Sequence, residues 1–261
     1  MNFWIVDTFC DDVFCNNPSA VFFIDEFGDD RLLQNISMEI NTTETIFVKD
    51  LQNCKFEAMC FTPNSKGLYL GNGLFAAAKV ICEKYPKLKE FDIRSEERAF
   101  NVKVLHNGEI TICFPTIPLR DVIKPIDLSA AFDEQTIVSV AECQNDLIVE
   151  MRDLKELFNL KPNLDALNKI DYKSFVMVAV ENQTDGGYNF CAKVCAPKLG
   201  IFNGVTTPIA YAELAAYWAN KINKAEFIGR AKSERINVKY NSEFTYITSN
   251  CVISTGGTTS F

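Results

Sequence analysis

The stretch Leu68–Cys82 reads LYLGNGLFAAAKVIC and places two glycines directly before an alanine-rich segment. From Leu74 onward, apolar residues recur at i, i+3, i+4, i+7 and i+8, a pattern typical of a helix face directed toward a core. Gly71 and Gly73 allow a ligand to approach the backbone N–H groups where this helix begins, and a helix N-terminus carries partial positive charge. The stretch therefore predicts a buried helix whose start suits a carboxylate or phosphate.

Glycine serves equally well in a tight turn between a strand and a helix, so a purely structural role for this pair stays open. A second small-residue loop, running from Asn203 to Pro208, also precedes an alanine-rich segment. Thr207 is suited to cap that second helix, and Pro208 is suited to its first turn. Two such helix N-termini would be able to bind one anionic ligand between two domains, where pockets often form.

Composition limits the possible partners. The 261 residues are 48% hydrophobic, enough for a large core, and the net charge is −8. No run of lysine and arginine stands out, which excludes nucleic acid as the main partner. The first residues lack a basic signal-peptide start, and no run of about 18 apolar residues occurs. We therefore expect a soluble cytoplasmic protein with no nucleic-acid or membrane partner.

The ten cysteines are scattered, many within apolar segments, and predict buried free thiols instead of a disulfide framework. No Cys-x-x-Cys pair occurs, and the only histidine, His106, lies in a predicted hairpin turn, so we expect no metal site. An enzyme that uses Cys60, Cys191 or Cys195 as a nucleophile is an alternative, and it requires a thiolate with a lowered pKa.

Hydrophobic periodicity and turn signals indicate an α+β protein. The first part is expected to hold a helix at 30–40 that buries Leu32, Leu33, Ile36 and Ile40. Strands are predicted at 2–7, 19–25, 44–50 and 55–61, followed by a hairpin around Asn107-Gly108. Strands and helices do not alternate as in a doubly wound fold and hairpins dominate, so mixed or antiparallel sheets wrapped on a helix are expected.

Three prolines between residues 115 and 125 interrupt the pattern and favour an extended connector. We place the domain boundary there, giving an N-terminal half at 1–118 and a C-terminal half at 119–261, with the last strand able to return to the first half. The second half is predicted to hold strands at 146–151, 175–180 and 188–195, a short helix at 154–159 and the alanine-rich helix from Pro208. This order resembles that of the first half, as expected of a duplicated unit.

Glu44 is the candidate acid or base. In the segment TTETIFVKD, the two-residue period of a strand places Glu44 on the same face as Ile46 and Val48. If that face is the core, desolvation raises the pKa of the carboxyl toward neutrality, the condition for proton transfer near neutral pH. The alternative is a glutamate at a strand end, exposed to water.

Together these motifs resemble the PhzF-type phenazine-biosynthesis family, relatives of diaminopimelate epimerase. The start VDTFCDDVFCNNPSAVFFI resembles the family's D-A-F-T…G-N-P-A-A-V, with Asn16 where glycine is usual. INTTETIFV resembles its N-L-S-E-T-A-F motif, and CFTPNSKGLYLGNG its F-T-P…L-C-G-H segment. VCAPKLGIFNGVTTPIAYAELAAYW resembles its F-A-P…G-I…D-P-V-T-G-S-A-H stretch, and FIGRAKSERI its glycine-arginine motif. The resemblance covers nearly the whole chain.

The resemblance implies a diaminopimelate epimerase-like fold of two similar halves, each a strongly curved, barrel-like sheet around a central helix, with the site in the cleft and a homodimer as the assembly. It also implies isomerisation without a cofactor: a glutamate takes a proton from one carbon of a cyclic amino-carboxylate, and a proton is returned elsewhere. Glu44 falls on that glutamate.

The partner positions differ from the family's pattern. Asn72 stands where the family has a histidine and Asn203 where it has an aspartate, and neither amide titrates near neutral pH. Leu70 and Thr206 stand where the epimerases have paired catalytic cysteines, so a racemase with two thiols is not expected.

At the second loop, Thr207 and Pro208 replace a glycine and a serine of the family, which removes one N–H donor. We therefore predict a PhzF-like isomerase that acts on a small carboxylate-bearing molecule without cofactor or metal, with Glu44 as general acid and base. A catalytically silent member that binds a small molecule or acts as a scaffold is the alternative. The predicted substrate-binding residues are Gly71, Asn72, Gly73, Asn203, Thr206 and Thr207.

Overall fold

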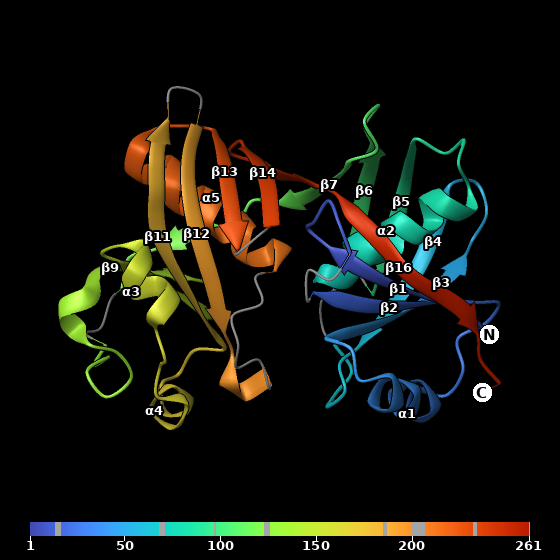
Figure 1. Ribbon diagram of the computed structural model, residues 1–261, viewed down its shortest axis with the longest axis horizontal. Helices are drawn as coiled ribbons and strands as arrows, with labels where there is room; N and C mark the ends of the chain where they lie inside the picture. The colour runs from blue at the N-terminus through green and yellow to red at the C-terminus, as the bar shows by residue number, and fades with distance from the viewer. Residues whose placement is uncertain are drawn as a thin grey trace. The chain divides into compact units, whose positions relative to one another are not determined.

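The computed structural model describes residues 1–13, 17–67, 71–96, 98–122, 126–184, 187–199, 207–231 and 234–260. Internal contacts divide the chain into two compact units, Met1–Cys113 with Ile247–Phe261, and Phe114–Tyr246 (Figure 1). Mixed, curled sheets dominate and helices are few, as the predicted α+β class requires. The halves 1–118 and 119–261 stay a prediction as domains.

In the first unit, neighbouring strands follow the order β16-β1-β2-β3-β4-β5-β6-β7. The bounds are β1 (Asn2–Thr8), β2 (Pro18–Ile24), α1 (Asp30–Ile40), β3 (Glu44–Asp50), β4 (Lys55–Phe61), α2 (Asn72–Lys84), β5 (Glu90–Ser95), β6 (Arg98–Val104), β7 (Ile110–Pro115) and β16 (Cys251–Thr258). The chain's final strand thus pairs with its first, in antiparallel register from Asn2 opposite Thr258 to Thr8 opposite Cys251.

In the second unit, neighbouring strands follow the order β14-β13-β12-β11-β10-β9-β8. The bounds are β8 (Leu119–Arg120), β9 (Ile137–Cys143), β10 (Asp146–Met151), α3 (Leu154–Asn159), α4 (Leu164–Lys169), β11 (Ser174–Thr184), β12 (Gly187–Cys195), α5 (Pro208–Ile222), β13 (Glu226–Ala231) and β14 (Glu234–Tyr240). The strand β15 (Phe244–Ser249) begins in the second unit and ends in the first, because the division along the chain falls after Tyr246. Short 3-10 helices lie at Glu134–Thr136 and Pro197–Leu199.

The expectation that helices and strands would not alternate is wrong. Two strand pairs in the first unit run parallel, β2 with β3 and β4 with β5, and each pair is separated along the chain by one helix. In the second unit β10 runs parallel to β11 and β12 runs parallel to β13. Helices α3 and α4 lie between the first pair along the chain, and a short 3-10 helix and α5 lie between the second pair. Parallel neighbours need a crossover, which these helices supply. Other neighbouring strands, among them β1 with β2, β3 with β4 and β11 with β12, are antiparallel, so the sheets are mixed.

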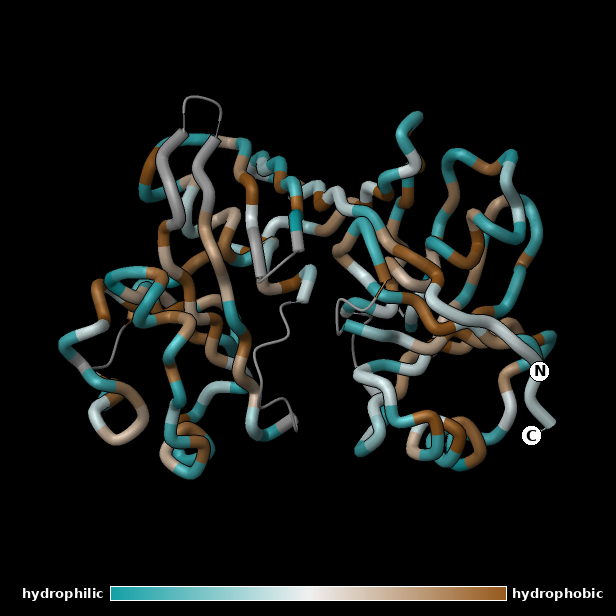
Figure 2. Tube along the Cα trace, viewed as in Figure 1, coloured by the Kyte–Doolittle hydropathy of each residue, from teal (hydrophilic) through white to brown (hydrophobic). Residues whose placement is uncertain are grey.

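Helix α1 covers one face of the first sheet, as its amphipathic sequence predicts (Figure 2). Asp29 caps it by accepting a hydrogen bond from the Arg31 backbone N–H at 3.1 Å. Leu33 and Ile36 pack into a cluster with aromatic side chains of the strands. Leu32, predicted to be buried, is 49% exposed, because the helix rests on β3 and β4 by a narrower face than expected.

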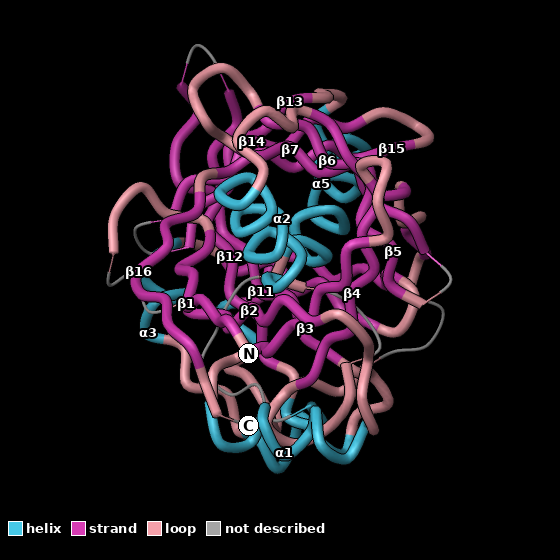
Figure 3. Tube along the Cα trace, turned by 90° about the vertical axis from the view of Figure 1, so that its right-hand side faces the viewer, coloured by secondary structure: helices cyan, strands magenta, loops and turns pink. Residues whose placement is uncertain are grey.

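Helix α2 is buried over most of its length, although Lys79 and Cys82 are only partly buried. Of the predicted face, Leu74, Ala77, Ala78 and Ile81 are buried, whereas Cys82 at its end is only partly buried. Phe75, Ala76 and Val80 on the other faces are buried as well. The helix contacts β1, β2, β3 and β16 (Figure 3). A helix whose faces are mostly apolar has to be mostly enclosed, and its small alanines allow strands to approach closely.

Helix α5 begins as predicted. The Thr207 hydroxyl accepts a hydrogen bond from the Ala210 backbone N–H at 3.3 Å, and Pro208 occupies the first turn. Most of this helix is buried too, including Leu214 and Trp218, and it packs against β14. The cap means that the start of α5 already holds a hydrogen-bond acceptor of its own.

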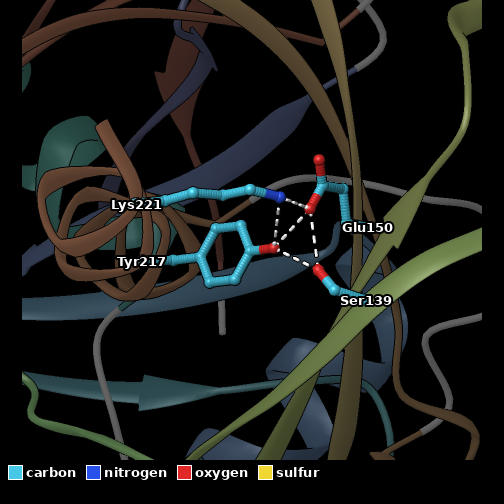
Figure 4. Close-up of polar contacts among 4 residues, drawn as sticks. All are labelled: Ser139, Glu150, Tyr217 and Lys221. Carbon is cyan, nitrogen blue, oxygen red and sulfur yellow. Dashed lines mark hydrogen bonds and ion pairs between the residues drawn. The ribbon is translucent and has the colours of Figure 1, made fainter.

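A polar cluster ties the second half of α5 to two strands (Figure 4). One carboxylate oxygen of Glu150, on β10, accepts hydrogen bonds from Ser139 on β9 and from Tyr217 and Lys221 on α5. The Glu150 side chain is nearly buried. Burial alone would raise the pKa of Glu150, but these hydrogen bonds and the Lys221 charge outweigh it, so the pKa lies below its usual value.

Replacing Glu150 by alanine is expected to lower the free energy of unfolding at pH 7 by about 2 kcal/mol, because it removes the charged acceptor that three donors share and leaves the Lys221 charge without its counter-ion. Urea unfolding measures the change. Glu226→Ala is the matched control, since Glu226 pairs with Lys239 at 2.9 Å but both side chains are about 70% exposed, and such pairs contribute at most about 1 kcal/mol. If Glu150→Ala and Glu226→Ala lowered the free energy of unfolding equally, the cluster would not stabilise the packing of α5.

Candidate functional site

Glu44 opens β3 and is 9% exposed, so the alternative of a strand-end glutamate in water is wrong. The residues that follow it on the strand, from Thr45 to Val48, are buried too, which places both faces of β3 in the interior. Glu44 and Ile46 both reach the start of α2, because both would meet a side chain added at Gly73. The two-residue period predicted from the sequence therefore describes this face correctly.

The start of α2 binds the Glu44 carboxylate. The Gly73 backbone N–H donates to Oε2 at 2.6 Å, and the N–H groups of Gly71 and Asn72 also lie within hydrogen-bonding reach. Gly71, the N-cap residue, has no side chain to satisfy these donors. The anion site predicted at this helix start thus holds a carboxylate of the protein itself, at the positive end of the helix dipole.

Burial raises the pKa of Glu44 from its usual 4.5 to about 7, although the hydrogen bonds from Gly73, Asn72 and Gly71 and from the Cys60 thiol act in the opposite direction. Near pH 7 the carboxyl is therefore present in both protonation states. A group with this property is able to take a proton from one atom and return one to another.

The glycines leave the space that the carboxylate occupies. A Cβ built at Gly71 would lie 2.4 Å from Glu44 Oε1, and one at Gly73 would lie 2.7 Å from Glu44 Oε2 and 2.1 Å from Ile46 Cδ1. These separations are far below van der Waals contact. The close approach of helix and carboxylate therefore requires glycine, beyond what a tight turn alone would need.

Alanine at Gly73 is expected to lower the free energy of unfolding by about 2 kcal/mol, because Ile46 and Glu44 would have to move apart from the helix start. A Cβ at Gly28 meets only Leu32 Cδ2, at 3.8 Å, so Gly28→Ala is the control and should stay within about 0.5 kcal/mol of wild type. Thermal or urea unfolding compares the two. Similar stabilities would mean that the helix start tolerates a side chain.

Asn72 and Asn17 form a buried amide pair beside the carboxylate. The Asn72 Nδ2 donates to Asn17 Oδ1 at 2.8 Å, and both side chains are almost fully buried. Within the part of the chain that the structure describes, Asn17 Nδ2, Asn72 Oδ1 and the hydroxyl of Ser19 have no hydrogen-bond partner. Buried polar atoms are seldom left this way, so the amide pair still offers one donor and one acceptor.

The sequence did not single out Asn17. Asn17 lies next to Asn16 in the NNPSAV segment, which resembles a family motif, and that was the only feature that pointed to it. No local pattern indicates its pairing with Asn72, which is 55 residues away. Of the other predicted binding residues, Asn203 and Thr206 lie outside the described residues, and Thr207 caps α5. The ligand-binding role of the six predicted residues stays a prediction.

The cysteine alternatives find no support. Burial, followed by the charge of Glu44, raises the pKa of Cys60 well above its usual value, and burial raises the pKa of Cys195. Cys191 is buried as well. A nucleophilic thiolate needs the opposite shift. The described cysteines are free, as predicted, but Cys54 is exposed, contrary to the expectation of buried thiols.

In the described ranges, no three histidine, cysteine, aspartate or glutamate side chains are gathered so that they could hold a metal ion. No described helix combines the length and the apolar character needed to cross a membrane.

Comparison with known proteins identifies the family. The phenazine biosynthesis-like protein family PhzC-PhzF matches residues 6–243. An uncharacterized isomerase of Halalkalibacterium halodurans is 27% identical over 234 residues, covering 89% of this chain and 87% of that protein. The structure of a putative phenazine biosynthesis PhzC/PhzF protein from Clostridium difficile superposes with a TM-score of 0.85 at 26% identity and covers 100% of both chains.

The fold extends to more distant proteins. A probable proline racemase from Agrobacterium radiobacter has a TM-score of 0.65 at 8% identity, covering 99% of this chain and 92% of that one, which is a likeness of fold alone. The match to the family over residues 6–243 confirms the resemblance predicted from the motifs. This chain belongs to the PhzC-PhzF family of phenazine biosynthesis-like proteins.

Proposed function

We propose that this protein is a PhzF-like isomerase that needs no cofactor and moves a proton, and with it a double bond, in a small cyclic amino-carboxylate. Glu44 acts as general acid and base. One observation supports the proposal above all: burial against the start of α2 gives the Glu44 carboxyl a pKa of about 7. Such a carboxyl is able to act in both directions at neutral pH.

In this reaction the ionised Glu44 takes a proton from one carbon, and the electron pair of the broken C–H bond shifts the double bond. A proton is then returned at a second carbon, from Glu44 itself or from water. The unpaired donor of Asn17 and the unpaired acceptor of Asn72 are the polar atoms that a substrate carboxyl or amino group would satisfy. In this proposal Asn203 assists from the second loop.

We further propose that the protein has two similar halves, each a curved sheet around a central helix, and that it forms a homodimer in the cytoplasm, as the family resemblance implies. The same succession of antiparallel and parallel neighbours in β1 to β6 and in β9 to β14 supports the similarity of the halves. The contacts of the largely buried α2 with β16, β1, β2 and β3 support a central helix in the first half.

A binding protein without activity is the second candidate. Its support is Asn72, an amide that cannot donate or accept a proton near neutral pH, at the position where the family's histidine was expected. In this case Glu44 would serve only as the cap of α2.

Deuterium exchange separates the two functions. A metabolite extract in D₂O is incubated with the native protein, with the heat-denatured protein and without protein, and is then examined by mass spectrometry. The isomerase predicts deuterium on one small carboxylate with the native protein alone. A lack of label in all three samples, with the native protein shown to be folded, would refute the isomerase and leave the binding protein.

A further inference from the structure

Cys60 lies on the same face of the first sheet as Glu44. On the antiparallel neighbours β3 and β4, Cys60 is directly opposite Ile46, two residues along the strand from Glu44. Side chains in such a diagonal relation point to the same side of the sheet and lie within reach of each other. The Cys60 thiol is accordingly within hydrogen-bonding reach of the Glu44 carboxylate.

Gly67 packs closely against Cys60. Gly67 N–H donates to the Cys60 carbonyl at 2.9 Å, and a Cβ at Gly67 would lie 3.2 Å from the Cys60 sulfur. Cys60 itself is buried. The thiol is therefore buried with Gly67 and the Glu44 carboxylate as near neighbours, and a side chain at position 67 would press on the sulfur.

The thiol differs in kind from the other groups that bind Glu44. The backbone N–H groups of Gly71 and Gly73 are fixed donors and are unable to accept a proton or a hydrogen bond. A thiol donates weakly through S–H and accepts weakly through sulfur. It is therefore able to bind the carboxylate when Glu44 is ionised and the carboxylic acid when Glu44 is protonated, with a change only in the S–H torsion.

We propose that Cys60 is a positioning residue for Glu44: its thiol favours the ionised base and holds the carboxyl in one orientation while the proton moves to and from the substrate. This inference rests on the proposed isomerase activity. It assigns no bond-forming role to the sulfur, which remains a thiol throughout.

Three variants test the inference. Cys60→Ala removes the donor, Cys60→Val removes it while filling the space, and Cys60→Ser retains it. Cys195→Ala is the matched control, because Cys195 is equally buried but lies in the second unit. Carbon-13 NMR of protein labelled at the glutamate carboxyls follows the titration of Glu44 without any substrate, and the signal missing from Glu44→Gln identifies the residue.

The midpoint of the Glu44 titration, about 7 in the wild type, is expected to rise by about half to one pH unit in Cys60→Ala and Cys60→Val, because a donor to the charged form is lost. Cys60→Ser should restore or lower it, and Cys195→Ala should leave it unchanged. The pH profile of deuterium exchange should move in the same direction as the titration. Unchanged midpoints in both Cys60→Ala and Cys60→Val would overturn the inference.

The two proposals fail in different ways. If the wild type exchanges protons but the Cys60 variants keep the wild-type midpoint and pH profile, the role of Cys60 is refuted and the isomerase stands. If the wild type exchanges no protons, the isomerase is refuted and the positioning role falls with it, whatever the titration shows.

Discussion

Glutamine in place of Glu44 will reduce the rate of proton exchange on the substrate by about 10²- to 10⁴-fold, the usual contribution of a general acid or base. The amide has nearly the same shape, and its oxygen still accepts the Gly73 N–H that now binds Oε2 at 2.6 Å. What the variant lacks is a group that is able to take a proton. The fold is therefore kept while the chemistry is lost.

Deuterium incorporation into the labelled carboxylate, measured for both proteins at equal concentration, gives the ratio of rates. The wild-type rate of proton abstraction should rise as the pH increases through about 7, because the base is the ionised form of Glu44. Glu226→Gln, an exposed glutamate in the second unit, is the control and should exchange at the wild-type rate. A Glu44→Gln protein that retains more than about a tenth of the rate would contradict the role of Glu44.

Glutamine in place of Glu213 will stabilise the protein, increasingly so as the pH rises. Glu213 lies buried in the middle of α5, next to Asp146 at the start of β10 and to Cys143 at the end of β9. Burial raises the pKa of Glu213 well above its usual value, and the Asp146 charge raises it further. Asp146 accepts a hydrogen bond from the Ser174 N–H at 3.1 Å and lies near Lys173, so the shared proton resides on Glu213.

Because the pKa of Glu213 is raised in the folded protein, the stability that this residue contributes to the wild type falls as the pH rises. The folded protein benefits fully from a protonated Glu213 below the usual pKa of 4.5, and that benefit is lost as the pH rises toward the pKa of the folded state. Each pH unit in that range costs the wild type up to about 1.4 kcal/mol, whereas glutamine does not titrate. Above pH 5 the advantage of Glu213→Gln should therefore grow with pH until the pKa of the folded state is reached.

Urea unfolding of both proteins at several pH values measures this difference. Glu226→Gln is again the control, because its exposed carboxyl should give a difference that stays nearly constant with pH. A constant difference for Glu213→Gln as well would show that Glu213 is already ionised at pH 5 in the folded protein.

Local patterns predicted the first unit well. The helix Asp30–Ile40 and the strands Glu44–Asp50 and Lys55–Phe61 have the predicted bounds. In each case the apolar period and the flanking turn residues agree with the final packing. The two-residue period along β3 also predicted that Glu44 shares a face with Ile46 and Val48, but it left open whether that face is buried. Burial follows from the neighbouring strands and α2, which enclose the strand.

What the sequence did not predict depends on contacts between distant segments. The partners Asn17 and Asn72 are 55 residues apart, and Glu150 and Lys221 are 71 apart, so no local period indicates that they meet. The parallel pairs were missed for a related reason. Whether two strands joined through a helix become neighbours is decided by the packing of the whole sheet and not by the strands' own composition.

The central claim is that Glu44 carries protons near neutral pH, and the most direct test is the carbon-13 titration of its carboxyl in the wild-type protein without substrate. The buried contact with the start of α2 predicts a midpoint of about 7. A midpoint near the usual 4.5 would show a carboxylate that stays ionised, and it would contradict the account.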